Sequence, residues 1–446
     1  MSSAQNPAVS VLAKGAQSGI GLPLRLVLAA LPVMPSPLMQ APLFGIGALR
    51  VANIILALAC FSFVKGIVDS AKLPNLDTIQ KRALWFFGVY LLLFVVAFVR
   101  SIPNLPQFVA LFPTMFSIDV ISYVDYELIV PLFYAFVFVY VLVLIRSQED
   151  LLETFAAIAA GVVIQALVVV YCFIENPQIL SGDDRFGISG ITDQVLAMHY
   201  NDVAATYIIT GPLLLYFALK RGGGWMVAYV LSIVAVLLLE SRTGIFVFAA
   251  MSFLTLLAAG GARFSMWWIV AAVGGCVGAL GNILAKLLST GISGRYGFSL
   301  YLLLSGRLEK IWTPLLMEWL SSAQLFWFGA GEYGMLTSRM LASGLMLFVA
   351  EAHNAFLEFF LDDGIVLFVL FTAILLFLLF MGWRQGRRLR SGLYWSLFLC
   401  IVGFLASCFS GRRFFPHPEN AMIFPILAAL LGAARLTLAK MQATAR

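Results

Sequence analysis

Long, uninterrupted apolar runs constrain the fold of this chain more than any other feature. One example is RALWFFGVYLLLFVVAFVR, which runs from Arg82 to Arg100. Of the 446 residues, 62% are hydrophobic and 11% are charged, whereas ordinary soluble domains are about 45–50% apolar and about 25% charged. No soluble fold of this length could bury so much apolar surface, so the lipid bilayer must act as the solvent.

A chain in a bilayer spans it either as helices or as a closed barrel, because its backbone polar groups need internal partners. Barrel strands would alternate in polarity over about ten residues, whereas the runs here are continuously apolar. A helical span needs about 20 apolar residues, and that window gives twelve candidates: 24–44, 49–68, 83–100, 126–145, 152–174, 202–219, 224–240, 243–260, 265–288, 358–382, 392–410 and 420–439. The sequence therefore predicts an all-α polytopic membrane protein with about 12 transmembrane helices, in one integral membrane domain over 1–446. Four prolines interrupt the first candidate, which we expect to be broken or tilted.

The basic residues support this count and set the orientation. Cytoplasmic loops are enriched in Lys and Arg, so we read the net charge of +6 as a topology signal rather than as a sign of nucleic-acid binding. With the N-terminus in the cytoplasm, the even-numbered loops and the tail collect these residues: Lys65, Lys72, Lys81, Arg82, Arg146, Lys220, Arg221, Arg263, Arg384, Arg387, Arg388, Arg390, Arg435, Lys440 and Arg446. Both termini are therefore predicted to be cytoplasmic.

The opposite, outer face carries one large insertion, about 289–357, between the ninth and tenth spans. Its segment GRLEKIWTPLLMEWLSSAQLFWF has apolar residues at helical spacing, so we expect short amphipathic helices near the membrane surface. The start of the chain lacks the features of a cleavable signal peptide. The five cysteines fall in apolar runs and are interpreted as small buried hydrophobes.

Arginines and histidines also gather on the predicted outer face. The set comprises His199, His353, His417, Arg100, Arg185, Arg242, Arg295, Arg307, Arg339, Arg412 and Arg413. Arginine on the translocated side opposes the topological bias, and a guanidinium binds phosphate in a bidentate manner. An anionic, membrane-bound ligand such as a lipid-linked diphosphate would explain the set. Pairing with nearby acids such as Glu240, Glu309 and Glu351 is the alternative.

Three segments concentrate these residues. LLLESRTGIFVF carries Arg242, which could line a bundle cavity or simply extend to the interface. SGRLEKIW carries Arg307, Glu309 and Trp312. EAHNAFLEFFLDDGIVLF carries His353, Asn354 and Glu358 near one-turn spacing, although a histidine at a helix start is often only a cap. Asp362 and Asp363 follow inside the tenth candidate span, where they would line a cavity or lie near the interface.

The order of these motifs resembles the O-antigen ligase and O-antigen polymerase superfamily of bacterial inner-membrane glycosyltransferases. The resemblance rests on SR-x-G, then GRxExxW, then GAGEYG (Gly329 to Gly334), then HN-A-FLE-x(5)-G, and it covers roughly 180–385. It implies an enzyme with its active site facing the periplasm, which uses an undecaprenyl-diphosphate-linked glycan as donor. Polymerases transfer the growing chain to the next lipid-linked repeat of O-antigen or exopolysaccharide, and ligases transfer it to lipid A–core in lipopolysaccharide biosynthesis.

The ligase pattern is His, then Asn, Ser or Gln, nine residues, Gly, two residues, and Gly, Thr or Tyr. His353, Asn354 and Gly364 match it, but Leu367 stands at its last position. SGRLEKIW is more similar to the polymerases, and we favour that interpretation. The expected partners are the lipid-linked donor, an acceptor glycan or lipid A–core, membrane lipids and a chain-length regulator protein, with no nucleic acid.

The predicted chemistry follows from the resemblance and from the residue types. Arg242 and Arg307, with Arg185 behind them, would stabilise the charge that develops on the leaving diphosphate. His353 would act as general base, with Glu351 or Glu358 as its orienting partner or replacement. Asn354 and Glu309 complete the predicted substrate-binding set. Direct displacement would invert the anomeric carbon, and neither a metal nor another cofactor is expected.

Two other classes of protein remain open. A secondary transporter also has about twelve spans, but it usually has related halves and midplane charges on broken helices. A lipid-linked sugar flippase would move the same substrate without forming a glycosidic bond. A structural scaffold is the third option, which the excess of outer arginines disfavours.

Overall fold

The computed structural model of the chain describes residues 21–41, 43–45, 50–69, 76–113, 115–116, 119–176, 191–192, 194–260, 307–349, 352–408 and 413–444. Within these residues every regular element is a helix and none is a strand. The longer N-terminal helices are α2 (Leu22–Ala30), α4 (Val51–Asp69), α5 (Thr78–Ser101), α8 (Val130–Leu144) and α9 (Gln148–Glu175). The others are α12 (Tyr200–Arg221), α13 (Gly224–Leu238), α14 (Arg242–Gly260), α20 (Ala355–Leu389), α21 (Gly392–Ser407) and α22 (Ile423–Thr444).

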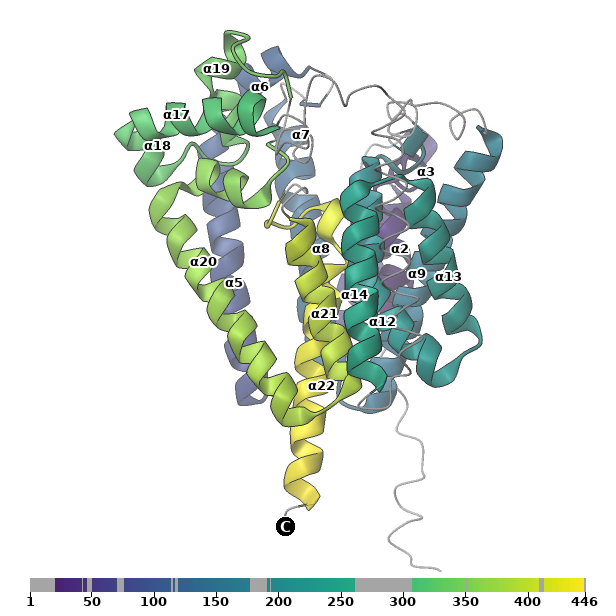
Figure 1. Ribbon diagram of the computed structural model, residues 1–446. Coiled ribbons are helices and arrows are strands. Elements are labelled where there is room, and N and C mark those ends of the chain that lie inside the picture. Colours follow the sequence, from purple (N-terminus) through teal and green to yellow (C-terminus); the bar gives the residue numbers. More distant parts are fainter. Residues whose placement is uncertain are drawn as a thin grey trace, which may run out of the picture.

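Shorter helices connect these elements or cover their ends. They are α3 (Pro37–Gln40), α6 (Leu105–Leu111), α7 (Val120–Val124), α17 (Thr313–Ser321), α18 (Ala323–Phe328) and α19 (Arg339–Ala342). Two π-helical turns, Asp125–Ile129 and Leu308–Trp312, precede α8 and α17. Three of the short helices, α17 to α19, belong to the predicted 289–357 insertion and lie at the end of the molecule opposite the C-terminus (Figure 1).

The fold confirms a multi-pass, all-α membrane protein. Among the described residues, six helices are long and apolar enough to cross a bilayer, and five more helices are apolar but shorter. Together they overlap eleven of the twelve predicted spans. The remaining window, 265–288, lies outside the described residues, so the count of twelve stays a prediction. The first candidate is broken as expected, because α2 gives way to a 3-10 turn at Leu31–Val33 and then to a bend.

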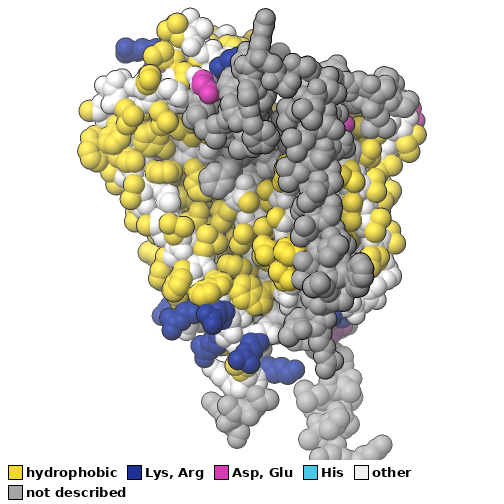
Figure 2. Space-filling model, viewed as in Figure 1, with side chains coloured by type: hydrophobic (Ala, Val, Ile, Leu, Met, Phe, Trp, Pro, Cys, Tyr) yellow, Lys and Arg dark blue, Asp and Glu magenta, His cyan; other side chains and the backbone are white. Residues whose placement is uncertain are grey.

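The two ends of the bundle differ in their polar groups. At one end Arg25 Nη2 lies 2.7 Å from Glu153 Oε2, Gln80 donates to the Leu142 carbonyl at 2.8 Å, and Arg435 lies 3.5 Å from Asp77. We call this the basic end, because exposed arginines in the last turns of α20 and directly after it are there: Arg384, Arg387, Arg388 and Arg390. Figure 2 shows Lys and Arg side chains gathered beyond a broad hydrophobic surface. We call the opposite end the site end.

The centre of the bundle is α12, which packs on α13, α14 and α21. Its Tyr207, Val203 and Leu213 are fully buried. By contrast, α20 exposes most of its length, including Val369 at 55% and Leu376 at 61%. Figure 1 shows α5 and α20 at one side of the bundle, beneath the short helices. Because lipid solvates such surfaces, an exposed apolar helix is expected in a membrane protein.

Helix α20 has a break at Gly364, and the GAGEYG motif fits into that break. Gly364 has φ 77° and ψ 176°, which leaves the carbonyls before it without their usual helical donors. The 329–334 segment supplies two of them: the Ala330 N–H donates to the Leu361 carbonyl and the Gly331 N–H to the Asp362 carbonyl, both at 2.9 Å. The motif is therefore a structural seal that joins the insertion to a span.

This seal decides the surroundings of Asp362 and Asp363. Both side chains are buried, at 8% and 2% exposure. Asp362 Oδ1 accepts the Gly334 N–H at 2.7 Å, and Arg100 Nη2 donates to the Gly329 carbonyl at 2.8 Å. Neither aspartate is at an open interface, because the 329–334 segment covers them.

Candidate functional site

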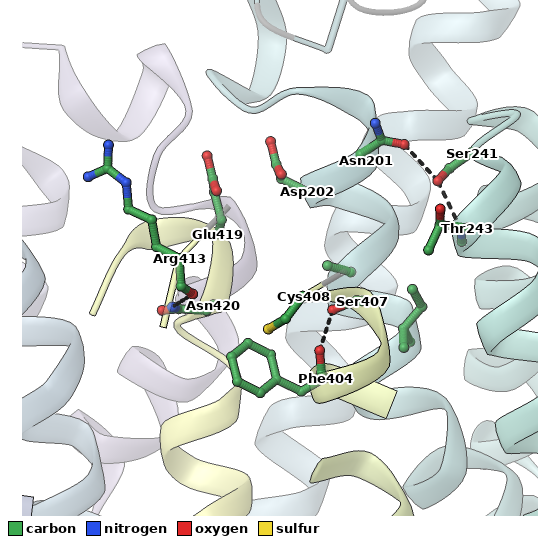
Figure 3. A pocket seen from close by; sticks show the side chains of 13 residues that line it. Asn201, Asp202, Ser241, Thr243, Phe404, Ser407, Cys408, Arg413, Glu419 and Asn420 are labelled. Atoms are coloured by element: carbon green, nitrogen blue, oxygen red, sulfur yellow. Dashed lines mark hydrogen bonds between the residues drawn. The ribbon is translucent and has the colours of Figure 1, made fainter. Parts of the chain in front are cut away.

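A cavity at the site end lies between α12, α14, α21 and the chain that leads into α22 (Figure 3). Its empty space, counted together with the open solvent at its mouth, is about 480 Å³. The lining combines polar and apolar residues: Asn201, Asp202, Ala205, Ile208, Ser241, Thr243, Gly244, Phe404, Ser407, Cys408, Arg413, Glu419 and Asn420.

The SR-x-G motif builds one wall of this cavity. Ser241 Oγ donates to Asn201 Oδ1 at 2.8 Å and accepts the Gly244 N–H at 3.0 Å, so it both caps α14 and ties it to α12. A Cβ on Gly244 would lie 2.9 Å from Ser241 and 3.0 Å from Ala204 Cβ. The glycine therefore permits the close approach of the two helices. Arg242 begins α14 beside this wall, and its side chain lies outside what the structure describes.

Two long helices begin at the cavity. Asn201 and Asp202 lie in the first turn of α12, and Thr243 and Gly244 lie in that of α14. The first N–H groups of a helix lack internal partners, and its dipole places about half a positive charge at that end. The two N-termini therefore contribute positive potential at this end of the bundle, which the carboxyl groups of Asp202 and Glu419 in the lining oppose.

Arg413 adds a cation to the cavity lining, held in place by an extended network. Its Nη1 lies 3.1 Å from Glu332 Oε1 and 3.9 Å from Glu127 Oε2, and its guanidinium carbon is 3.7 Å from the Tyr333 ring centroid. The Tyr333 hydroxyl donates to Glu127 Oε2 at 2.6 Å. Burial raises the pKa of Glu332 well above its ordinary value, and Arg413 opposes this shift. The GAGEYG segment thus contacts the cavity lining at Arg413, through Glu332 and Tyr333.

The GRxExxW motif lies against the same end. Arg307 is half-buried and within electrostatic range of Tyr200, the first residue of α12, and burial lowers the pKa of its guanidinium. The Trp312 indole N–H donates to the Ala352 carbonyl at 2.8 Å. The motif therefore links the start of α12 to the turn that carries His353. Glu309, in the π-helical turn between them, is exposed.

The HN-A-FLE motif forms the turn before α20. His353 is half-buried with φ 55°, a left-handed conformation that is uncommon outside glycine and worth attention at functional sites. Asn354 caps α20, because its Oδ1 accepts the N–H groups of Phe356 and Leu357. Glu358 Oε1 accepts the Ala352 N–H at 2.8 Å. Asn354 and Glu358 thus hold the histidine turn in shape.

One hydrogen bond fastens this turn to the cavity. The Ala355 N–H donates to the Cys408 carbonyl at 2.9 Å, and Cys408 lines the cavity. His353 is two residues from this anchor but does not itself line the cavity. The structure therefore brings three sequence-distant motifs, around residues 241, 307 and 353, to one end of the bundle.

The predicted site residues are not all placed. Arg185 and Glu351 lie outside the described residues. Sequence reasoning missed the residues that face the cavity most directly, namely Asn201, Asp202, Glu419 and Asn420. Asp202 had a signal, because an acid at the start of an apolar run is typical of a helix N-terminus. No signal in the sequence pointed to Glu419.

Among the described residues no group of three His, Cys, Asp or Glu side chains could hold a metal ion. The absence of a metal from the reaction stays a prediction.

Comparisons with known proteins do not assign a family to this chain. A scan of the chain against models of protein families finds no match, and a search among curated proteins finds none either.

Proposed function

We propose that the protein is a membrane glycosyltransferase that takes a glycan from a polyprenyl diphosphate, undecaprenyl diphosphate in bacteria. The cavity at the site end is the observation that carries this proposal. It combines two helix N-termini and Arg413, which suit a diphosphate, with hydroxyl, amide and carboxylate groups of the kind that bind sugar hydroxyls. The apolar outer sides of α5 and α20 are available to the lipid part of such a donor.

The proposed reaction needs stabilisation of the leaving diphosphate and a base for the attacking hydroxyl. Arg307 and Arg242 remain our assignments for the first task, and Arg413 joins them because it lines the cavity. His353 remains the assignment for the second, because its turn is hydrogen-bonded to Cys408 in the cavity lining through the Ala355 N–H. The transfer would be metal-independent and inverting, at the periplasmic face of the inner membrane.

Polymerisation of O-antigen or exopolysaccharide units is the reaction we favour, and ligation to lipid A–core is the alternative within the same chemistry. The preference rests on SGRLEKIW and on Leu367, which stands where ligases have Gly, Thr or Tyr. Leu367 packs with the apolar cluster of Phe94 and Phe359 rather than facing the cavity.

One observation favours a transporter or flippase as the second candidate. Helix α20 is broken at Gly364, next to the buried Asp362 and Asp363, and broken helices with buried charges are typical of transporter binding sites. The seal by residues 329–334 weighs against this alternative, because it fills the break with protein. If the protein is a transporter, its point variants should give glycan chains of wild-type length whenever they move as much lipid-linked sugar as the wild type does.

The test is to delete the gene in its native host and to separate lipopolysaccharide and released polysaccharide by size. Complementation uses the wild type, His353→Ala, Arg307→Ala and, as a control for an exposed cation at the same end, Arg339→Ala. Single repeats on lipid A–core indicate a polymerase. Bare core with long glycan retained on the lipid carrier indicates a ligase. Loss of a secreted polymer alone indicates an exopolysaccharide polymerase.

The site assignment predicts that Arg339→Ala restores the wild-type pattern and that the other two variants do not. Full restoration by all three variants would show that the site is wrong. An unchanged glycan profile in the deletion strain would remove the glycosyltransferase proposal and favour the transporter.

A further inference from the structure

We infer that the helix pair α17–α18 anchors the insertion in the lipid leaflet at the site end, with Phe328 among the acyl chains, Trp327 at the hydrocarbon boundary and Leu320 just above it. The sequence predicts only that the insertion carries amphipathic helices near the membrane surface. The partner inferred is the lipid itself, whatever reaction the protein catalyses.

The outer face of this helix pair is apolar and carries no charge. Four large apolar side chains are between 51% and 65% exposed: Met317, Leu320, Trp327 and Phe328. The other exposed residues of the two helices are also uncharged: Ser321, Ala323 and Gln324. An exposed apolar face of this kind is typical of a surface that contacts protein or lipid.

The polar groups of the larger side chains of α17 are bound elsewhere. Glu318, the one charged residue in the two helices, accepts the Arg339 N–H at 2.8 Å and the Ser338 hydroxyl, both at the start of α19. Trp319 is buried, and its indole N–H donates to the Leu361 carbonyl of α20 at 3.1 Å. A helix with its charge held on one side and apolar side chains on the other is suited to the membrane interface.

The length of α20 indicates the depth at which this face lies. Arg384 begins the exposed arginines of the basic end. The hydrocarbon core of a bilayer is about 30 Å thick, and a helix crosses it with about 20 residues. Counting back from Arg384, about 20 residues lead to Gly364, so the opposite boundary lies near the break in α20. Figure 1 shows α20 inclined to the central helices, and tilt moves this boundary further toward Ala355.

The end of α18 is fixed at the level of this break. A Cβ on Gly364 would lie 2.4 Å from the Trp327 carbonyl oxygen and 2.6 Å from the Phe328 backbone nitrogen, so the two backbones are in contact. Tryptophan is enriched at the boundary between hydrocarbon and headgroups, because its ring is apolar and its N–H is polar. Trp327 therefore lies at the depth that bilayers favour for this residue.

The outer face of the pair also continues a surface that already contacts lipid. Val366, Val369 and Leu370 follow the break in α20 and are all more than half exposed. Figure 2 shows hydrophobic surface on this side of the molecule, from the short helices toward the Lys and Arg side chains of the basic end. Lipid that covers α20 up to its break therefore also covers the end of α18.

Spin-label accessibility of the full-length protein in palmitoyl-oleoyl phosphatidylcholine vesicles tests this inference. Phe328→Cys and Leu320→Cys carry a nitroxide in a background without the native cysteines, with Val369→Cys as the lipid reference and Ala342→Cys, exposed in α19, as the water reference. Oxygen concentrates in hydrocarbon, whereas a soluble nickel chelate stays in water. The ratio of oxygen to nickel collision rates should exceed that of Ala342→Cys at both positions, by at least about fivefold at Phe328→Cys.

Two results would overturn the inference. A ratio at Phe328→Cys equal to that at Ala342→Cys would place this face in water. Low collision rates with both reagents would show that the label is buried against protein rather than lipid.

A fluorescence measurement tests the same contact without a cysteine variant. Brominated acyl chains quench tryptophans that touch them, and the chain has nine tryptophans. The wild type should lose more fluorescence intensity in brominated vesicles than Trp327→Phe does, because position 327 contributes to the quenched emission. Equal losses in the two proteins would contradict a lipid contact of Trp327.

Discussion

Arg413 shows how a single side chain can join the cavity to the rest of the molecule. It lines the cavity while it contacts Glu332, Glu127 and the face of Tyr333. Removal of one partner from a buried ion pair leaves an uncompensated charge, which typically costs about 3–5 kcal/mol. Part of that cost is avoided when the remaining acid takes up a proton, so the effect depends on pH.

Arg413→Ala is therefore expected to lower the unfolding midpoint more at high pH than at low pH. Burial already raises the pKa of Glu332 above 4.5, and loss of Arg413 raises it further. A carboxyl with a raised folded-state pKa stabilises the fold fully below its unfolded pKa, and this contribution is lost as the pH rises through the folded value. Thermal unfolding in detergent between pH 4.5 and 8.5 measures the effect.

The double variant Arg413→Ala/Glu332→Gln should lose most of that pH dependence, because no buried carboxyl is left at position 332. Arg339→Ala, an exposed arginine at the same end, should unfold like the wild type at every pH. If the unfolding midpoint of Arg413→Ala lies below that of the wild type by the same amount at every pH, the proposed link between Arg413 and the protonation of Glu332 is wrong.

At the scale of elements, the break in α20 depends on one glycine. The positive φ of Gly364 disfavours other residues, and a Cβ there would lie 2.4 Å from the Trp327 carbonyl oxygen. Gly364→Ala is expected to destabilise the protein by about 2–4 kcal/mol, from left-handed strain and displacement of Trp327 and Phe328 at the end of α18. It should also expose Asp363 and abolish complementation in the glycan assay.

Gly88→Ala is the control for that substitution. Gly88 lies within α5, and a Cβ there would meet nothing within 4 Å. Alanine in a helix interior is favoured by up to about 1 kcal/mol over glycine, so this variant should be as stable as the wild type or slightly more so. Equal unfolding midpoints for the two alanine variants would show that the break tolerates a side chain.

At the scale of the whole molecule, the separation of the basic end from the site end predicts the orientation. Ala342→Cys in α19 and Ala443→Cys near the end of α22 place single thiols at exposed positions of the two ends, in a background without the native cysteines. Membrane-impermeant maleimide on intact spheroplasts should label the first variant and not the second. Permeabilised cells should label both, and the reverse pattern in intact cells would invert the proposed topology.

The sequence predicted which motifs belong to the site, but it did not predict how they contact one another or the cavity. SR-x-G, GRxExxW and HN-A-FLE were predicted as one site, and hydrogen bonds of Ser241, Trp312 and Ala355 join them at one end. The structure adds contacts that the sequence did not predict, because Asn354 and Glu358 hold a turn and GAGEYG seals a helix. Nothing in a local segment reveals such contacts, since each joins residues far apart in the chain.

The sequence by itself determined that this protein is a helical membrane protein and where most of its long apolar helices lie. Those properties are local, because a bilayer requires long apolar helices and charge follows the ends of spans. Only the tertiary structure decided that Asp202 and Glu419 share a cavity with Arg413, and that Gly364 breaks α20 beneath the 329–334 segment. Such features depend on which helices pack together, and one apolar span packs against several others with similar free energy.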